Sequence, residues 1–341
     1  VKREKLGKTL SLIAKNGPNI FYEGDVAEAI SKATKNILTN EDIKNFKSKW
    51  VSPLSIDLYG KTGWVTPPHT QSYLTLATLK AYEIITNSSK DFNLHVLIEC
   101  YRSLAADRDH ITYDYGDKID SFIGLNFDYI KSKALEIDVN QTSLFKSPEN
   151  LGSGTAYMAV KDEGGNAVSL IQSNFYGIGS TIGVSDYGFF LHNRGAGFNL
   201  IENHPNKIAP LRKPLHTLSP TIWSKDGKLD MVIGTRGGRY QPQLLSQFIL
   251  PLLLESSSLE QVMKKSRWTI DYFDEHTESH LIFEPGTDKA IIKDLEQKGH
   301  NIKIEKSMQG SYGPISAICK DNNGQWSGVA DSRVETSKAI Y

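Results

Sequence analysis

A threonine that directly follows a run of small residues is the position in this sequence best suited to chemistry. Gly152, Ser153 and Gly154 precede Thr155, and residues 155–160 then alternate between apolar and other side chains. A second run spans residues 164–173, and residues 162–166 form a polar turn where the two runs meet. This pattern predicts two strands joined by a tight turn. Thr155 is therefore expected to be the first residue of a strand.

Cleavage of the chain before Thr155 would give this residue a free α-amino group, which can act as the base for its own hydroxyl. An α-amino group titrates at about 7.7 to 8.0, so it is partly neutral near neutral pH and needs no histidine or aspartate partner. The sequence predicts cleavage of the bond between Gly154 and Thr155. The local pattern also fits a threonine that merely starts an ordinary strand.

A glycine pair, Gly237-Gly238, is the candidate for stabilising the negative charge that acyl transfer builds on a carbonyl oxygen. Two backbone N–H groups that converge on such an oxygen contribute about 3 kcal/mol each. Glycine suits this role because it lets the backbone approach closely and adopt positive φ. A simple turn between Ile233 and the following helix is the alternative.

Hydrophobic periodicity predicts the elements that must position these residues. Helices are expected at residues 5–16, 25–38, 40–50, 71–86, 92–106, 241–255, 259–267 and 288–298. Strands are expected at residues 53–59, between 155 and 238, and at 302–305, 315–319 and 326–330. This order favours an α+β fold with antiparallel sheets covered by helices. Residues 107–153 lose periodicity and are interpreted as a long linker that leads to the cleavage point.

Composition limits the classes of partner. The 341 residues carry 39 basic and 39 acidic side chains, so no net positive field is available to hold nucleic acid. The longest apolar run, residues 248–254, is interrupted by Pro251 and is too short to span a membrane. The chain begins with Val1, which suggests that an upstream portion is absent. The location is left undecided, with the cytoplasm favoured.

Neither a metal nor a cofactor is predicted. His276 and His280 have helical spacing but no obvious third ligand, which favours a surface loop. The glycine-rich run at residues 177–183 has the wrong spacing for a dinucleotide fingerprint, and it is interpreted as a loop beside the active site. Cys100 and Cys319 are expected to be buried free thiols.

Several motifs resemble the γ-glutamyltransferase (γ-glutamyltranspeptidase) family in order and spacing. Those resembling its small subunit are Gly154-Thr155, Gly165-Asn166-Ala167-Val168, Gly188-Phe189-Phe190-Leu191-His192-Asn193, Lys213-Pro214-Leu215-His216-Thr217-Leu218-Ser219-Pro220 and Gly234-Thr235-Arg236-Gly237-Gly238. Those resembling the late part of its large subunit are Phe21-Tyr22-Glu23-Gly24, Pro67-Pro68 and Ala106-Asp107-Arg108. The terminal run Gly328-Val329-Ala330-Asp331-Ser332-Arg333 and Tyr341 also resemble the family's terminus.

The resemblance implies a four-layer αββα sandwich of the N-terminal-nucleophile hydrolase type. It implies that residues 1–154 are the late part of a large-subunit segment, that residues 155–341 are a small-subunit segment carrying the nucleophile, and that the two together form one domain. Autocatalytic cleavage of a zymogen would make the cleaved fragment the partner of the rest. Thr155 would be the nucleophile, and Gly237 and Gly238 would bind the oxyanion. The substrate would be a small γ-glutamyl or acyl amide, as in glutathione metabolism. Assembly into a homo-oligomer stays open.

The sequence departs from the family where the glutamate headgroup is bound. Ala156 replaces a second threonine, Arg194 and Gly197 stand where the family has glutamine and aspartate, and His216-Thr217 replaces a serine pair. The missing aspartate is the family's partner for the substrate α-ammonium. The sequence here looks more like an acylase-like branch of the family. Ser173 or Asn174 is a candidate to take over part of this binding, together with Arg194, His216 and Thr217.

Three functions follow from these observations. The first is an autoprocessed γ-glutamyltransferase-like enzyme that forms an acyl-threonine and passes the acyl group to water or an amine. The second is a cephalosporin- or glutaryl-type acylase with broad amide hydrolysis. The third is an uncleaved, non-catalytic homologue that acts as a binding protein.

Overall fold

The computed structural model describes residues 2–145, 154–255, 257–270, 280–308 and 313–335. Contacts between residues divide the chain into two compact units. The small unit contains residues 1–51 and 174–194, and the large unit contains residues 52–173 and 195–341. This division does not follow the expected cleavage point, so the two-segment organisation of residues 1–154 and 155–341 stays a prediction.

The small unit is mostly helical. Its elements are α1 (Glu4–Asn16), α2 (Asn19–Tyr22), α3 (Asp25–Ala33), α4 (Asn40–Asn45), β5 (Gly183–Val184) and β6 (Phe189–Phe190). Val26, Ile30 and Val184 form its buried core. The helix expected over residues 25–38 is shorter because Lys35 and Asn36 have positive φ, which ends the α-helix. The helix expected to reach Trp50 ends at Asn45, where the backbone becomes extended.

A six-stranded antiparallel sheet is the centre of the large unit. In spatial order its strands are β1 (Leu54–Leu58), β2 (Lys61–Val65), β7 (Thr221–Lys225), β8 (Lys228–Thr235), β12 (Ile315–Lys320) and β13 (Trp326–Ala330). Successive side chains of a strand point to opposite faces of a sheet. In β8, Met231 and Ile233 join the main hydrophobic core, which lies on the helical side of the sheet.

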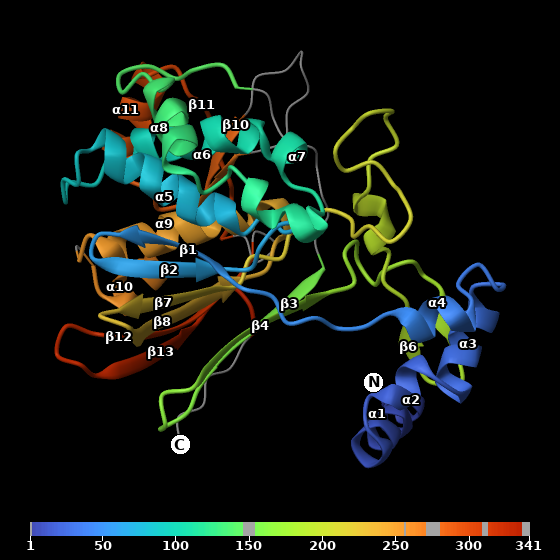
Figure 1. Ribbon diagram of the computed structural model, residues 1–341. Coiled ribbons are helices and arrows are strands. Elements are labelled where there is room, and N and C mark those ends of the chain that lie inside the picture. The colour runs from blue at the N-terminus through green and yellow to red at the C-terminus, as the bar shows by residue number, and fades with distance from the viewer. Residues whose placement is uncertain (1, 146–153, 256, 271–279, 309–312, 336–341) are drawn as a thin grey trace. The chain divides into compact units, whose positions relative to one another are not determined.

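Helices cover one face of this sheet (Figure 1). The layer consists of α5 (Tyr73–Ile85), α6 (Leu94–Ala106), α8 (Phe127–Leu135) and α9 (Gln241–Leu253). A Cβ at Gly63 of β2 would lie 2.6 Å from the Leu76 side chain of α5, so glycine there lets the helix approach the sheet closely. Leu76 and Trp223, which are both fully buried, pack at this contact.

A long two-stranded hairpin packs on the opposite face (Figure 1). It consists of β3 (Thr155–Lys161) and β4 (Ala167–Ser173), paired in register along their whole length. The Asp162 carboxylate accepts bonds from the backbone and side-chain amides of Asn166 and so closes the connecting turn. The strand pair predicted from the sequence is therefore confirmed, and Thr155 is the first residue of β3.

A smaller sheet and further helices complete the large unit. They are β9 (Trp268–Ile270), β10 (His280–Phe283), β11 (Asn301–Ile304), α10 (Leu259–Lys264) and α11 (Lys289–Gln297). The prediction of a structureless linker over residues 107–153 is wrong for much of its length. Residues 108–135 contain α7 (Arg108–Ile111), a 3-10 helix, η1 (Gly116–Ser121), and α8. The Asn126 side chain caps the N-terminus of α8, and Ile130 and Ala134 are the buried residues of this helix.

The fold mixes helices and sheet as expected, whereas the four-layer sandwich stays a prediction. Helices, the six-stranded sheet and the β3–β4 hairpin give three successive layers in the large unit. Cys100 and Cys319 are buried free thiols, as predicted. Among the described residues, no helix is both long and apolar enough to cross a bilayer.

Candidate active site

Two contacts fix the direction in which β3 crosses the six-stranded sheet. The Tyr157 ring fills the space that a side chain at Gly234 would occupy, and Gly234 pairs with Ser316. Four residues further along β3, the Lys161 ammonium lies 4.9 Å from the centre of the Trp326 ring, and Trp326 pairs with Lys320. Thus β3 runs in the direction of β12 and opposite to β8.

This direction places Thr155 at the end of the sheet where β8 finishes. Thr155 lies two residues before Tyr157, so its side chain is on the same face of the hairpin as the Tyr157 ring. It is only 9% exposed and pairs with Ser173 of β4. Gly154, immediately before it, has φ +153°, a conformation that glycine adopts readily. The nucleophile candidate is therefore a largely buried residue at the start of a strand.

The glycine pair follows directly from the same end of β8. Gly237 and Gly238 have φ of +119° and +57°, values that an L side chain would disfavour. The Tyr240 N–H donates to the Gly237 carbonyl at 3.1 Å. Because N–H and C=O of a trans peptide point in opposite directions, the Gly238 N–H points away from this bond. The local geometry suits an N–H that must be available to an anion.

His216, which precedes Thr217, forms a backbone pair with the segment before α5. The His216 N–H donates to the His69 carbonyl at 3.0 Å, and the Gln71 N–H donates to the His216 carbonyl at 3.2 Å. The imidazole rings of His69 and His216 pack edge to face at 4.6 Å. Thr217 is 1% exposed, and its carbonyl accepts from the Ser219 hydroxyl. Of the two candidates, Thr217 is thus embedded in the protein.

Gln71 connects this segment to the glycine pair, and sequence reasoning missed it. Its side-chain NH₂ donates to the Thr217 carbonyl at 3.2 Å and to the Gly238 carbonyl at 3.1 Å. Its carbonyl accepts from the Arg108 guanidinium at 3.4 Å, and Arg108 in turn pairs with Asp109. Gln71 stands next to the Pro67-Pro68 motif, which is the only sequence signal that could have pointed to it.

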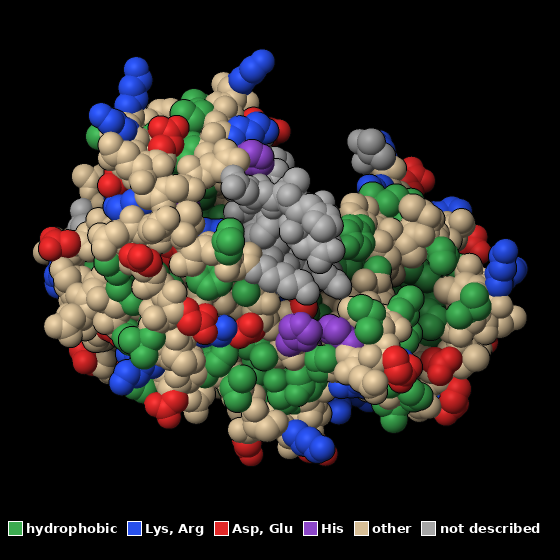
Figure 2. All heavy atoms as spheres, turned by 90° about the horizontal axis from the view of Figure 1, so that it is seen from above, with side chains coloured by type: hydrophobic (Ala, Val, Ile, Leu, Met, Phe, Trp, Pro, Cys, Tyr) green, Lys and Arg blue, Asp and Glu red, His purple; other side chains and the backbone are tan. Residues whose placement is uncertain are grey.

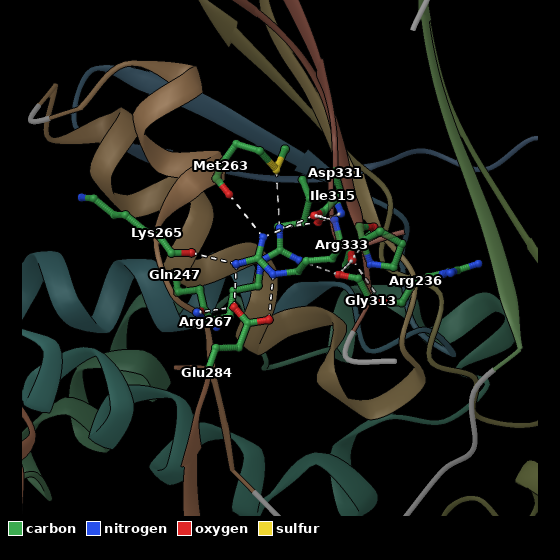
Figure 3. A network of polar contacts seen from close by, with 12 residues as sticks. Arg236, Gln247, Met263, Lys265, Arg267, Glu284, Gly313, Ile315, Asp331 and Arg333 are labelled. Carbon is green, nitrogen blue, oxygen red and sulfur yellow. Dashed lines mark hydrogen bonds and ion pairs between the residues drawn. The ribbon is translucent and has the colours of Figure 1, made fainter. Parts of the chain in front are cut away.

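A buried ion-pair network supports the backbone that leads to Gly237 (Figure 3). Arg333 makes a two-bond pair with Glu284 at 2.7 and 2.5 Å and also contacts Asp331 at 3.3 Å. Arg267 pairs with the other oxygen of Asp331 and donates to the Gly313 carbonyl at 3.0 Å. Burial by itself would raise the pKa of Asp331, but the Arg267 charge and two backbone N–H bonds hold it below its usual range.

Gly313, which the network holds, packs against the residues at the end of β8. A side chain at Gly313 would overlap the Arg236 carbonyl, and its φ of +109° also favours glycine. The Thr235 hydroxyl lies 3.0 Å from the carbonyl oxygens of both Gly313 and Pro314. Residues 235–236 are therefore held tightly against residues 313–314, just before the glycine pair begins.

Gly197 lies against the backbone before His216. A Cβ at this position would overlap the Leu215 carbonyl. The Asn206 side chain holds both segments of this contact. Its amide NH₂ donates to the Gly197 carbonyl at 2.6 Å, and its amide oxygen accepts from the Leu215 N–H at 3.2 Å. No side chain fits at position 197 in this arrangement, so a carboxylate there is excluded by space as well as by sequence.

The remaining binding candidates, Asn174 and Arg194, belong to the small unit. The Asn174 carbonyl accepts from the Asn193 N–H at 3.1 Å, and its side chain donates to the Ile178 carbonyl at 3.1 Å. The Arg194 guanidinium stacks 4.6 Å from the centre of the Phe175 ring. Burial lowers the pKa of Arg194 to about 10, which indicates that its charge is poorly hydrated. Their roles stay predictions.

A second polar cluster joins α6 to His300, which follows α11. His95, Glu99 and His300 have potential metal-ligating atoms within 4.8 Å of one another. The two imidazoles are hydrogen-bonded at 2.8 Å, and the Glu99 carboxylate accepts from Arg102 and from the Ser143 N–H. Because these bonds satisfy the ligating atoms and Arg102 adds a positive charge, the cluster is built as a hydrogen-bonded support rather than as a cation site.

Two other sequence predictions have limited structural support. His276 lies outside the described residues, and His280 is the first residue of β10. On the face seen in Figure 2, acidic and basic side chains are interspersed rather than gathered by sign. This distribution agrees with the net charge of zero, and the absence of a nucleic-acid partner stays a prediction.

Comparison with known proteins gives one family. The family profile described as Gamma-glutamyltranspeptidase matches residues 1–341. The chain is 33% identical over 339 residues to the glutathione hydrolase-like YwrD proenzyme of Bacillus subtilis, with 97% of this chain and 64% of that protein covered. It is 28% identical over 347 residues to the oxamate amidohydrolase proenzyme of Klebsiella pneumoniae, with 100% and 65% covered.

Solved structures agree with the sequence relatives. The cephalosporin acylase from Bacillus halodurans superposes with a TM-score of 0.83 at 27% identity, with 97% of this chain and 61% of that chain covered. The chain thus spans about two-thirds or less of the length of these relatives. Both sequence relatives are described as proenzymes.

Proposed function

The chain belongs to the γ-glutamyltranspeptidase family, and we propose that the protein is an autoprocessed amidohydrolase or acyltransferase whose nucleophile is Thr155. The observation that carries the proposal is the position of Thr155. It is a buried, strand-initial threonine, preceded by a glycine of positive φ, at the end of the sheet where Gly237 and Gly238 follow β8. The proenzyme relatives support a maturation step.

Maturation begins with attack of the Thr155 hydroxyl on the carbonyl carbon of Gly154. The new C–O bond gives a tetrahedral oxyanion, which collapses with cleavage of the C–N bond. The hydroxyl proton passes to the α-nitrogen of Thr155, which becomes a free amine, and Gly154 becomes an ester. Water then hydrolyses this ester, which leaves a carboxylate on Gly154 and restores the Thr155 hydroxyl. Residues 155–341 would start with the nucleophile.

Turnover uses the amine that maturation releases. The neutral α-amine takes the hydroxyl proton as the Thr155 oxygen attacks the amide carbonyl of the acyl donor. The N–H groups of Gly237 and Gly238 stabilise the resulting oxyanion. The α-ammonium returns its proton to the departing amine, which leaves an acyl-threonine ester. Water or an amine acceptor then attacks this ester and takes the acyl group.

The acyl donor is proposed to be an amide that need not carry an α-ammonium. Overlap with the Leu215 carbonyl leaves no space for an acidic partner at Gly197, where the family resemblance expects an aspartate. A cephalosporin acylase and an oxamate amidohydrolase among the relatives favour the acylase alternative. Arg194 is proposed to bind a carboxylate on the donor, because a planar guanidinium can form two parallel bonds to it.

Trapping of the covalent intermediate tests this function. The full protein is mixed with a slowly deacylated glutaryl or γ-glutamyl anilide, and the intact masses of its fragments are measured. The expected result is one acyl group on the fragment that begins at Thr155, with the modified residue identified as Thr155. Turnover by Thr155→Ala, or acylation at another residue, would contradict the proposal and favour a different nucleophile.

A further inference from the structure

Gln71 is a buried amide whose orientation is fixed by its neighbours. It is fully buried and lies two residues before α5. The Arg108 guanidinium can only donate hydrogen bonds, so the group that faces it must be the Gln71 carbonyl oxygen. The NH₂ group therefore faces the two carbonyls at 3.2 and 3.1 Å, and both of its hydrogens are used.

The two carbonyls belong to different segments, which this side chain joins next to a second link, the bond from the Ser219 N–H to the Gln241 side-chain oxygen at 2.9 Å. One is the Thr217 carbonyl, next to His216. The other is the Gly238 carbonyl, in the turn that follows β8. Gly238 has no Cβ to limit its torsions, and its φ of +57° shows that the turn needs this freedom. A turn with such freedom needs external bonds to hold one conformation.

Both peptides that flank Gly238 are held by their carbonyls. Tyr240 donates to the Gly237 carbonyl at 3.1 Å, and Gln71 donates to the Gly238 carbonyl at 3.1 Å. Fixing the first carbonyl sets the plane that contains the Gly238 N–H, because the peptide is planar. The second carbonyl belongs to the Gly238–Arg239 peptide, so fixing it sets ψ of Gly238 and restrains the other side of the turn. Together the two bonds hold both peptides of the turn that presents the Gly238 N–H.

We propose that Gln71 is a positioning residue: it holds the peptide that follows Gly238, steadies the turn that aims the Gly238 N–H at the oxyanion, and couples this aim to the His216-Thr217 segment. Arg108, braced by Asp109 at 2.7 Å, holds the Gln71 amide in place. The proposal rests on the proposed function, because aiming this N–H matters only if an oxyanion forms there. It predicts that Gln71 affects self-cleavage and turnover alike, since both reactions pass through a tetrahedral oxyanion.

The test replaces Gln71 with Met, which keeps the length of the side chain but removes both donors, and with Glu, which keeps the acceptor for Arg108. Gln243→Met is the matched control. Gln243 is 2% exposed, accepts from the Ile270 N–H at 2.7 Å and donates to the Tyr101 hydroxyl at 3.2 Å. It therefore loses a comparable pair of buried bonds on α9.

Four quantities are measured for each variant: the rate of self-cleavage, kcat and KM for an anilide donor, and the inhibition constant of a boronic acid analogue of the donor. The boronate forms a tetrahedral adduct and so reports on oxyanion binding. Both Gln71 variants are expected to lose about tenfold to a hundredfold in kcat, by comparison with loss of a direct oxyanion donor. Boronate affinity should fall in parallel, while KM changes by less than about threefold. Gln243→Met should keep kcat and boronate affinity near those of the wild type.

Two outcomes overturn the inference while leaving the proposed function intact. One is a kcat and boronate affinity of Gln71→Met within about twofold of the wild type. The other is an equal loss in Gln71→Met and Gln243→Met, which would mean that stability alone is responsible. If Gln71→Met does not fold, Gln71→Glu gives the same comparison. A wild-type protein without Thr155-dependent turnover would instead remove the proposed function, and the inference with it.

Discussion

Replacement of Arg333 by Met should destabilise the protein strongly. Arg333 forms two charge-assisted bonds to Glu284 and a third contact to Asp331, and the side chains of all three residues are fully buried. Its removal leaves the Glu284 carboxylate with the Arg267 backbone N–H at 2.9 Å, while Asp331 keeps the Arg267 guanidinium. Breaking a buried ion pair by removing one partner costs about 3–5 kcal/mol.

The expected change in melting temperature follows from the size of the chain. An unfolding entropy of about 2.1 cal/mol/K per residue converts 3–5 kcal/mol into a fall of about 4–7 °C for 341 residues. Scanning calorimetry or intrinsic fluorescence measures it. Lys207→Met is the control, because its pair with Glu202 is exposed and worth about 0–1 kcal/mol.

Arg333→Met should also lower kcat, because the ion-pair network holds Gly313 against the residues that precede Gly237 (Figure 3). A melting temperature within about 1 °C of the Lys207→Met control would show that the buried pair contributes little. Unchanged kcat in a clearly destabilised Arg333→Met protein would refute the link between this network and the glycine pair.

Three further predictions concern acid stability, the turn and the substrate. Burial first, and then His95, Arg102 and Lys298, lower the pKa of His300 to about 3. The neutral imidazole therefore costs the folded state nothing above about pH 6.5, and the free energy of unfolding falls by up to about 1.4 kcal/mol per pH unit as the pH drops from 6.5 toward 3. In denaturant titrations at several pH values, His300→Gln should lose stability less steeply than the wild type in acid. An unchanged dependence on pH would contradict this. Gly313→Ala should fold less stably and lose kcat, because the added methyl group overlaps the Arg236 carbonyl; wild-type kinetics would contradict the support assigned to this contact. Glutaryl and γ-glutamyl anilides should have comparable kcat/KM, and Arg194→Lys should weaken both; a preference above roughly a hundredfold, ~2.7 kcal/mol, for the γ-glutamyl compound would mean that the α-ammonium is recognised.

Local patterns were sufficient for the hairpin that begins at the candidate nucleophile and for the helix that follows the glycine pair. Alternation and a polar turn predicted β3 and β4, and apolar periodicity predicted α9 to within a few residues. These signals work because one face of each element is buried, which imposes a period on the sequence. The same reasoning failed for α8, where Asn126 begins a short helix inside a stretch rich in turn-forming residues.

Long-range contacts were beyond the sequence. Gln71 meets Thr217 and Gly238 across 146 and 167 residues. Apart from the nearby Pro67-Pro68 motif, nothing in its neighbourhood distinguishes it from an ordinary buried glutamine. The exclusion of side chains at Gly197 likewise depends on a backbone carbonyl from a distant segment. Residue types identified the candidate chemistry, whereas the residues that aim it required three-dimensional contacts.

The mass of the purified protein is the most direct test of the central claim that Thr155 is both the site of self-cleavage and the nucleophile. The wild type should give a fragment that begins at Thr155, and Thr155→Ser should give the corresponding fragment more slowly. Thr155→Ala should stay uncut between residues 154 and 155 and should be inactive. An uncut wild-type chain, or cleavage of Thr155→Ala at the same bond without added protease, would contradict the account.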